Sequence, residues 1–87
     1  MAQGIAILGS TGSIGIQALE VIGASDSLEV HSLLCLRNAG LAAEQADEHG
    51  AGKVCVVDPL PGTDTTGMVT GSEALEAAVD GADVVLN

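Results

Sequence analysis

The fold of this chain is decided by Gly9-Ser10-Thr11-Gly12-Ser13-Ile14-Gly15. This stretch follows a continuous apolar run at residues 4–8, which is typical of a fully buried strand. It leads into residues 13–23, where apolar side chains recur at the spacing of a helix. A glycine-rich turn between such a strand and a helix can bind phosphate through backbone N–H groups and the helix dipole. We therefore predict a phosphate-binding loop inside a strand–helix–strand unit.

The glycines of this loop have separate predicted roles. Gly9 permits a tight exit from the strand, Gly12 lets the backbone approach a pyrophosphate, and Gly15 lets the helix pack close to the sheet. Thr11 and Ser13 add hydroxyl donors at the same rim. Such a turn can also serve packing alone, but the strand before it and the helix after it favour dinucleotide binding. A P-loop is excluded, because the chain contains no Gly-Lys-Ser or Gly-Lys-Thr.

Strands and helices continue to alternate after the loop. The patterns predict strands at residues 28–34, 53–57 and 83–87, a second helix at residues 41–49 ended by Gly50, and a third helix capped by Ser72. Residues 59–71 are predicted to be loop, with Val69-Thr70 as a short candidate strand. The side chains predicted to face inward are, helix by helix, Ile14, Ala18, Val21 and Ile22; Ala42, Ala43 and Ala46; and Leu75, Ala78, Val79 and Ala82.

This alternation predicts the α/β class. We expect an incomplete Rossmann-like, doubly wound parallel sheet of four strands and three helices, covered on both faces. Four strands are roughly half to two-thirds of such a domain. The expected organisation is therefore that residues 1–87 are the N-terminal part of an NADP-binding Rossmann domain, with the catalytic and C-terminal domains absent.

The residues that follow the second predicted strand favour NADP over NAD. An NAD site expects an acidic side chain about 20 residues after the glycine loop, to hold a ribose 2′-hydroxyl. The chain has Cys35 and Leu36 there, followed by Arg37 and Asn38. A guanidinium suits a 2′-phosphate, and Asn38 can donate a further hydrogen bond. A solvated loop arginine is the alternative interpretation of Arg37.

Composition excludes several other functions. The formal net charge is −10, there are two basic residues (Arg37 and Lys53), and the chain has no aromatic side chain. It therefore has neither the cations nor the stacking surfaces that nucleic acid needs, and an anionic membrane would repel it. Cys35 and Cys55 are predicted to be buried reduced thiols, and the absence of a recognisable targeting signal leads us to expect a cytoplasmic protein.

The chain resembles the N-terminal segment of the 1-deoxy-D-xylulose 5-phosphate reductoisomerase family. The resemblance rests on residues 7–15, on Gln17-Ala18-Leu19-Glu20-Val21-Ile22, on residues 42–46 and 71–75, and on the final Ala82-Asp83-Val84-Val85-Leu86-Asn87. It implies that Thr11, Gly12, Ser13 and Ile14 contact the phosphates of NADPH, and that Arg37 and Asn38 lie at the adenosine 2′-phosphate. Leu36 stands where the family usually has glycine.

The resemblance also implies an activity for the whole enzyme. Members of the family isomerise 1-deoxy-D-xylulose 5-phosphate and reduce the result with NADPH to 2-C-methyl-D-erythritol 4-phosphate, in isoprenoid precursor biosynthesis. They use a divalent metal, Mg²⁺ or Mn²⁺, and the full-length enzyme is expected to be a homodimer that acts on a small phosphorylated sugar. No catalytic or metal-binding residue is assigned within this chain, and His31 and His49 are expected to be ordinary structural residues. Two alternatives stay open: another NADP-dependent reductase, such as an aspartate-semialdehyde dehydrogenase, and a non-catalytic dinucleotide-binding module.

Overall fold

A computed structural model describes residues 2–87. Its strands are β1 (Gln3–Leu8), β2 (Leu28–Cys35), β3 (Lys53–Val56), β4 (Val69–Thr70) and β5 (Val84–Leu86). Its helices are α1 (Ser13–Gly23), α2 (Ala39–His49), the 3₁₀ turn η1 (Gly71–Glu73) and α3 (Ala74–Val79). The sheet has five strands instead of the predicted four, because the candidate strand Val69-Thr70 pairs with Cys55 and Val56 of β3.

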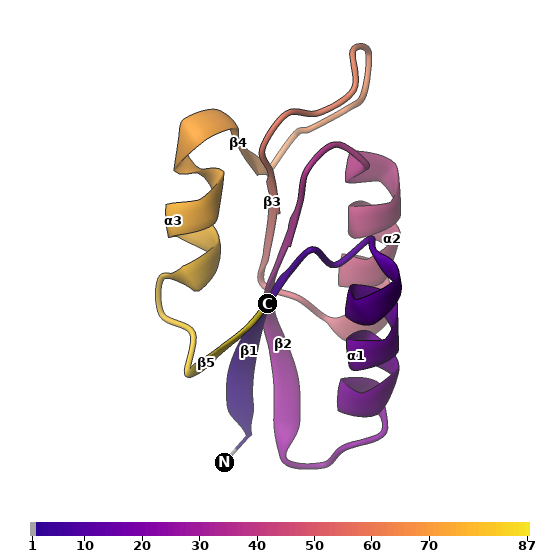
Figure 1. Cartoon of the computed structure of the whole chain (residues 1–87), viewed down its shortest axis with the longest axis vertical. Coiled ribbons are helices and arrows are strands. Elements are labelled where there is room, and N and C mark those ends of the chain that lie inside the picture. Colours follow the sequence, from indigo (N-terminus) through magenta and orange to yellow (C-terminus); the bar gives the residue numbers. More distant parts are fainter. Residues whose placement is uncertain (1) are drawn as a thin grey trace.

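The sheet is parallel and doubly wound, which confirms the predicted fold class. Its strand order is β4-β3-β2-β1-β5. Helices α1 and α2 lie on one face and α3 lies on the other (Figure 1). The chain moves outward from β1 to β4 and then returns to the far side of β1, so right-handed crossovers place the helices on opposite faces. The reversal leaves a topological switch point between β1 and β5.

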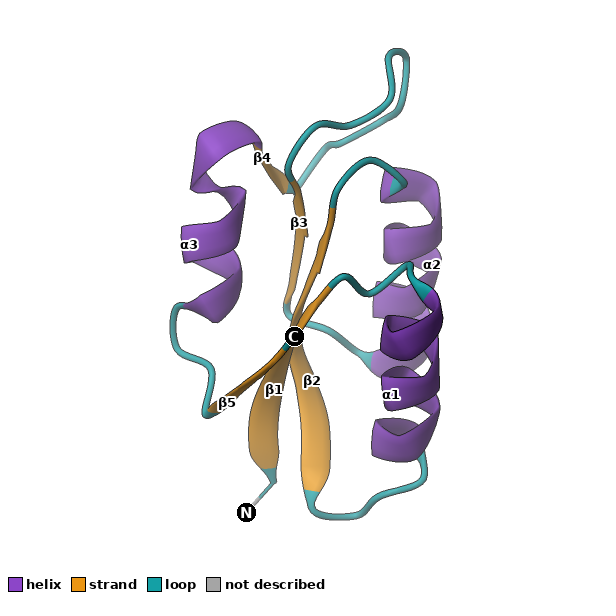
Figure 2. Cartoon of the chain, in the orientation of Figure 1, coloured by secondary structure: helices purple, strands orange, loops and turns teal. Residues whose placement is uncertain are grey.

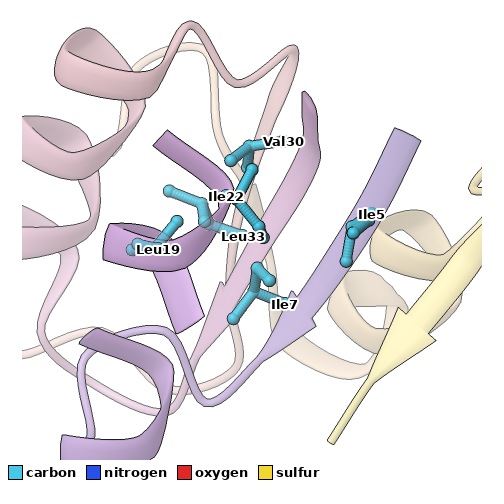
Figure 3. Close-up of a cluster of buried hydrophobic side chains, with 6 residues drawn as sticks. All are labelled: Ile5, Ile7, Leu19, Ile22, Val30 and Leu33. Atoms are coloured by element: carbon cyan, nitrogen blue, oxygen red, sulfur yellow. The ribbon is translucent and has the colours of Figure 1, made fainter. Parts of the chain in front are cut away.

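The core consists of small apolar clusters on the two faces of the sheet. Figure 3 shows the largest, where α1 packs on β1 and β2 through Ile5, Ile7, Leu19, Ile22, Val30 and Leu33. Under α3 the cluster is Leu34, Cys55, Ala74 and Ala78, and under α2 it is Cys35, Ala39, Ala42 and Val56. Alanine supplies much of the helical side of these clusters, so α2 and α3 approach the sheet closely.

The β1–β5 pair joins the first and last strands of the chain. Asp83 fastens it twice: its Oδ2 accepts a hydrogen bond from the Gly4 N–H at 2.7 Å, and its own N–H donates to the Gly4 carbonyl at 2.8 Å. The register continues with Ile5 opposite Val84. These contacts fasten the amino ends of β1 and β5, the two strands whose carboxyl ends flank the switch point.

The predicted inner face of α1 is partly wrong. Ile22 is buried as expected, but Ile14 is 75% exposed and Val21 is 66% exposed. The buried stripe is instead Gly15, Leu19 and Ile22. Apolar residues therefore form two overlapping stripes on α1, one through Ile14 and Val21 and one through Leu19 and Ile22. The close packing of Gly15 on the glycine loop turns the second stripe toward the sheet.

The third helix also departs from the prediction. Ser72 does not cap it; this residue lies inside η1, and no side chain caps α3. The preceding turn rotates the helix so that Ala74 and Ala78 are buried while Leu75 is 52% exposed. The helix ends at Val79, before Ala82, where Asp80 adopts an extended conformation. The Lys53 ammonium donates to the carbonyls of Ala77 and Asp80 at this end.

Helix α2 ends where it was predicted to end, but it buries one polar residue that was not predicted to face inward. Gly50 ends it in the left-handed conformation at φ 69°. Ala42 is fully buried and Ala43 and Ala46 are half-buried, in agreement with the predicted face. Gln45, which the apolar pattern did not place inside, is also buried.

Candidate functional site

The loops that follow β1, β2 and β3 gather at one end of the sheet (Figure 2). A hollow of about 360 Å³ opens there, between the carboxyl ends of β1 and β5. It is lined by Ile7, Leu8, Gly9, Gly12, Ser13, Ile14, Gly15, Leu86 and Asn87. This is the switch point, the place where doubly wound sheets bind ligands.

The glycine loop is pinned to the end of β2. The N–H groups of Gly9 and Ser10 both donate to the Leu34 carbonyl, at 2.7 and 3.0 Å. Gly9 has φ 86°, a left-handed conformation that only glycine adopts without strain, so its predicted role in the strand exit is confirmed. The Gly12 N–H then donates back to the Gly9 carbonyl at 3.1 Å, which closes the turn.

The other two glycines differ in what a side chain would meet. A Cβ on Gly15 would lie 2.2 Å from the Gly9 carbonyl oxygen and 2.7 Å from the Ser10 Cα. Gly15 therefore lets α1 pack against the loop itself, as well as near the sheet. Gly12 has an ordinary extended conformation, and a Cβ there would have its nearest neighbour at 3.5 Å. The protein alone does not require glycine at position 12.

Helix α1 presents uncapped amides to the hollow. Gly12 is its N-cap, no side chain bonds to the first turn, and the first turn contains no acidic residue. The first amides of any helix have no acceptor within the helix; here the first intrahelical bond is the one from the Ile16 N–H to the Gly12 carbonyl. Thr11 is half-buried and Ser13 and Ile14 are exposed at the same rim. The structure thus brings together Thr11, Gly12, Ser13 and Ile14, as predicted, in an arrangement suited to an anion.

Arg37 and Asn38 lie at the end of β2, and both already have partners. The Arg37 Nε–H donates to the Asp58 carbonyl at 3.3 Å and lies 3.7 Å from the Asp58 carboxylate. The two side chains are 49% and 71% exposed, so the pair is largely solvated. The Asn38 Oδ1 accepts the Leu41 N–H at 3.1 Å and caps α2. Only the amide nitrogen of Asn38 is left to donate to a ligand.

A second hollow, of about 400 Å³, adjoins the first at Leu8, Gly9 and Asn87. Its other lining residues are Leu34, Cys35, Leu36, Val57 and Leu75. Leu36, which precedes Arg37 in the chain, is 63% exposed and lines this hollow together with Gly9, so it forms part of an apolar floor beside the glycine loop. An apolar surface of this kind suits the flat face of a base.

Three residues at this end of the sheet were missed by reasoning from the sequence. Asp58 pairs with Arg37, Asn87 lines both hollows, and Gln45 bonds to the glycine loop. Asp58 follows a predicted strand and Asn87 is the last residue of another. That position was the available signal, because the carboxyl ends of parallel strands meet at one edge. Gln45 gave no comparable signal, since it lies within a helix.

The remaining polar residues serve the fold. In residues 2–87 no group of three or more His, Cys, Asp or Glu side chains could hold a metal ion, so the donors present do not fit the divalent metal of the family. His31 Nε2 bonds to the Asp80 carbonyl at 2.8 Å. Cys35 and Cys55 are free and buried, and they belong to the clusters under α2 and α3 respectively, on opposite faces of the sheet. Burial raises the pKa of both thiols.

None of the helices formed by residues 2–87 has the length and apolar character needed to cross a membrane.

Comparison with known proteins decides the family. The model of the 1-deoxy-D-xylulose 5-phosphate reductoisomerase family matches residues 5–87. The chain belongs to this family. The match decides against an aspartate-semialdehyde dehydrogenase.

Individual reductoisomerases agree with this membership. The enzyme of Nocardia farcinica is 45% identical over 87 residues, a match that covers 95% of this chain and 22% of the relative. For the enzyme of Mycolicibacterium smegmatis the identity is 45%, covering 98% of this chain and 23% of the relative. A solved reductoisomerase from Zymomonas mobilis, in complex with NADPH, superposes with a TM-score of 0.81 at 31% identity, covering 98% of this chain and 25% of that one. The chain thus spans less than a quarter of the length of these two curated relatives.

Proposed function

We propose that residues 1–87 form the N-terminal part of an NADP-binding Rossmann domain and that they bind NADPH. The observation that carries the proposal is the uncapped start of α1 behind a glycine loop pinned to β2, at the switch point of the sheet. The similar fold of a reductoisomerase in complex with NADPH supports it.

Each part of the nucleotide has a proposed partner in this chain. The pyrophosphate would accept hydrogen bonds from the N–H groups of Thr11, Ser13 and Ile14 and from the Thr11 hydroxyl. It would lie against Gly12, whose own N–H bonds to the Gly9 carbonyl. The adenosine would lie over the apolar floor that includes Leu36. The 2′-phosphate would meet the free nitrogens of the Arg37 guanidinium and the Asn38 amide.

This arrangement explains how a chain of charge −10 binds an anion. Backbone dipoles supply most of the attraction, and they need no lysine. Bound NADPH would supply a hydride, and this chain would hold the nucleotide and aim it along the carboxyl edge of the sheet. We propose the reduction and isomerisation of 1-deoxy-D-xylulose 5-phosphate, the divalent metal and homodimerisation for the whole enzyme, and we assign no residue of this chain to them.

Titration with NADPH and NADH tests the proposal. The chain has no aromatic residue, so the fluorescence of the reduced nicotinamide can be followed without a protein background. We expect NADPH to bind more tightly than NADH. Arg37→Ala should weaken NADPH binding about tenfold, the scale of a lost charge-assisted hydrogen bond, and leave NADH binding unchanged. An unchanged ratio of the two affinities would remove Arg37 from the site, and no binding of either nucleotide would refute the proposal.

A further inference from the structure

One buried polar contact joins α2 to the glycine loop from behind. The Gln45 side chain is 7% exposed, and its Nε2 donates to the Ser10 carbonyl at 2.8 Å. Ser10 itself is fully buried. Within residues 2–87, no other side chain forms a hydrogen bond with residues 9–15.

The chemistry of this contact is unambiguous. A carbonyl oxygen only accepts, so the amide nitrogen of Gln45, and not its oxygen, must face Ser10. The Gln45 Oε1 and the Ser10 Oγ are then left buried without a partner. An apolar side chain of similar size would fill the same space without an orphaned side-chain atom, but it would leave the Ser10 carbonyl unpaired. A glutamine at this position is therefore explained by the Ser10 carbonyl and not by packing.

The contact also orients the next peptide group. In a trans peptide the carbonyl and the following N–H point in opposite directions, and the described residues contain no cis peptide bond. Because Gln45 draws the Ser10 carbonyl toward α2, the Thr11 N–H points away from α2. β2 meanwhile holds the N–H groups of Gly9 and Ser10. The loop is thus held to β2 through its Gly9 and Ser10 N–H groups and to α2 through its Ser10 carbonyl.

We propose that Gln45 is a positioning residue for phosphate binding: its amide fixes the Ser10 carbonyl and so aims the Thr11 N–H at the nucleotide. The proposal rests on the proposed NADPH site and adds a residue that does not touch the nucleotide. Without Gln45 the Ser10 carbonyl is buried and unpaired, and the loop must move to reach water. The affinity for the nucleotide then falls in proportion to the fraction of chains whose loop is still in the binding conformation.

Gln45→Met tests the proposal, with Gln17→Met as the matched control. Gln17 is exposed on α1, so the same substitution there removes no contact to the loop. We expect Gln45→Met to raise the dissociation constant of NADP⁺ about tenfold. Hydrogen exchange of the amides of residues 9–12, measured without nucleotide, should also be faster in this variant. The control should match the wild type in both measurements. A folded Gln45→Met chain with wild-type affinity and wild-type exchange would overturn the proposal.

Gln45→Glu gives an independent readout that general damage to the fold would not produce. Burial raises the pKa of a carboxyl group; protonated, it can donate to the Ser10 carbonyl, and ionised, it cannot. The variant should bind NADP⁺ nearly as well as the wild type at pH 5 and lose affinity as the pH rises to 8. The ratio of variant to wild-type affinity at each pH cancels the titration of the 2′-phosphate itself. A ratio that does not change with pH would contradict the role.

The two proposals fail in different ways. If the wild type binds no NADP⁺, the proposed function is wrong. The exchange rates of the loop amides then still decide whether Gln45 fixes the loop. Faster exchange in Gln45→Met supports that role, and unchanged exchange refutes it.

Discussion

At the scale of single residues, Gly15 and Gly12 show that two glycines of one motif are needed for different reasons. Gly15 has backbone atoms within 3 Å of where its Cβ would be, whereas Gly12 has none. Glycine at position 15 is required by the packing of the protein itself. Glycine at position 12 is required only by the nucleotide proposed to lie in front of α1. Substitution can therefore separate stability from binding.

Gly15→Ala is expected to lower the free energy of unfolding by about 1–3 kcal/mol, the usual cost of overpacking against rigid neighbours. Urea unfolding followed by far-ultraviolet circular dichroism measures it. Gly12→Ala is the matched control: it should change stability by less than about 0.5 kcal/mol but weaken NADPH binding, because the methyl group projects toward the phosphates. Equal stability of the two variants would show that α1 can move away from the loop without cost.

Asp58 is the second residue whose replacement is informative. Its carboxylate lies 3.7 Å from the Arg37 Nε, beside the position proposed for the 2′-phosphate. Asp58→Asn should tighten NADPH binding about two- to fivefold, in line with the small energies of exposed ion pairs. NADH binding should stay the same. If NADPH binding weakens instead, Asp58 orients Arg37 more than it competes with the phosphate.

At the scale of elements, α2 depends on a residue that also belongs to the proposed nucleotide site. Asn38 begins the helix by accepting the Leu41 N–H, and its amide nitrogen remains free. One side chain thus combines a helix cap with a proposed phosphate donor. The two roles use different atoms, so they can be separated.

Asn38→Asp and Asn38→Ala form a matched pair. Aspartate keeps the cap, so stability should be close to that of the wild type, while its charge should weaken NADPH binding. Alanine loses the cap and should cost about 1 kcal/mol of stability. Thermal unfolding and nucleotide titration measure the two effects. If Asn38→Asp binds NADPH as well as the wild type, Asn38 is only a cap.

The elements also show how far the sequence alone could go. β1, α1 and β2 follow from strong local patterns, and the predicted bounds of α1 agree with the structure. The inner face of α1 could not be chosen locally, because Leu19 and Val21 are equally apolar and the loop contact of Gly15 decides between them. Gln45 was beyond prediction for a related reason: its partner, Ser10, lies 35 positions away. The glycine loop was predictable because it is itself a local pattern.

At the scale of the whole molecule, the two thiols lie under different helices on opposite faces of the sheet. Cys35 contacts the α2 cluster and Cys55 the α3 cluster, and burial raises the pKa of each above its ordinary value of 9.0. A disulfide between them is excluded by this geometry. The ionisation of these two thiols therefore depends on the packing of α2 on one face of the sheet and of α3 on the other.

The raised pKa values predict a loss of stability in alkali. Near neutral pH the thiols are protonated in both the folded and the unfolded chain, so they add no pH dependence there. Above pH 9 the unfolded chain releases these protons first, and unfolding becomes easier as the pH rises toward the folded-state pKa values. Urea midpoints measured between pH 8 and 10.5 should fall. The variant with both Cys35→Ala and Cys55→Ala should show a smaller fall, and an equal fall would assign the effect to other groups.

The double fastening of Asp83 to Gly4 has a kinetic consequence. It closes a loop of 79 positions, whereas β1, β2 and β3 are joined through neighbouring segments. Closing a long loop costs more chain entropy than closing a short one, and contacts between distant segments slow folding. The hollow at the switch point needs both β1 and β5, so it is complete only when the two ends of the chain have met. A nucleotide bound there, as proposed, would stabilise the β1–β5 pair and so protect the chain selectively against opening at its ends.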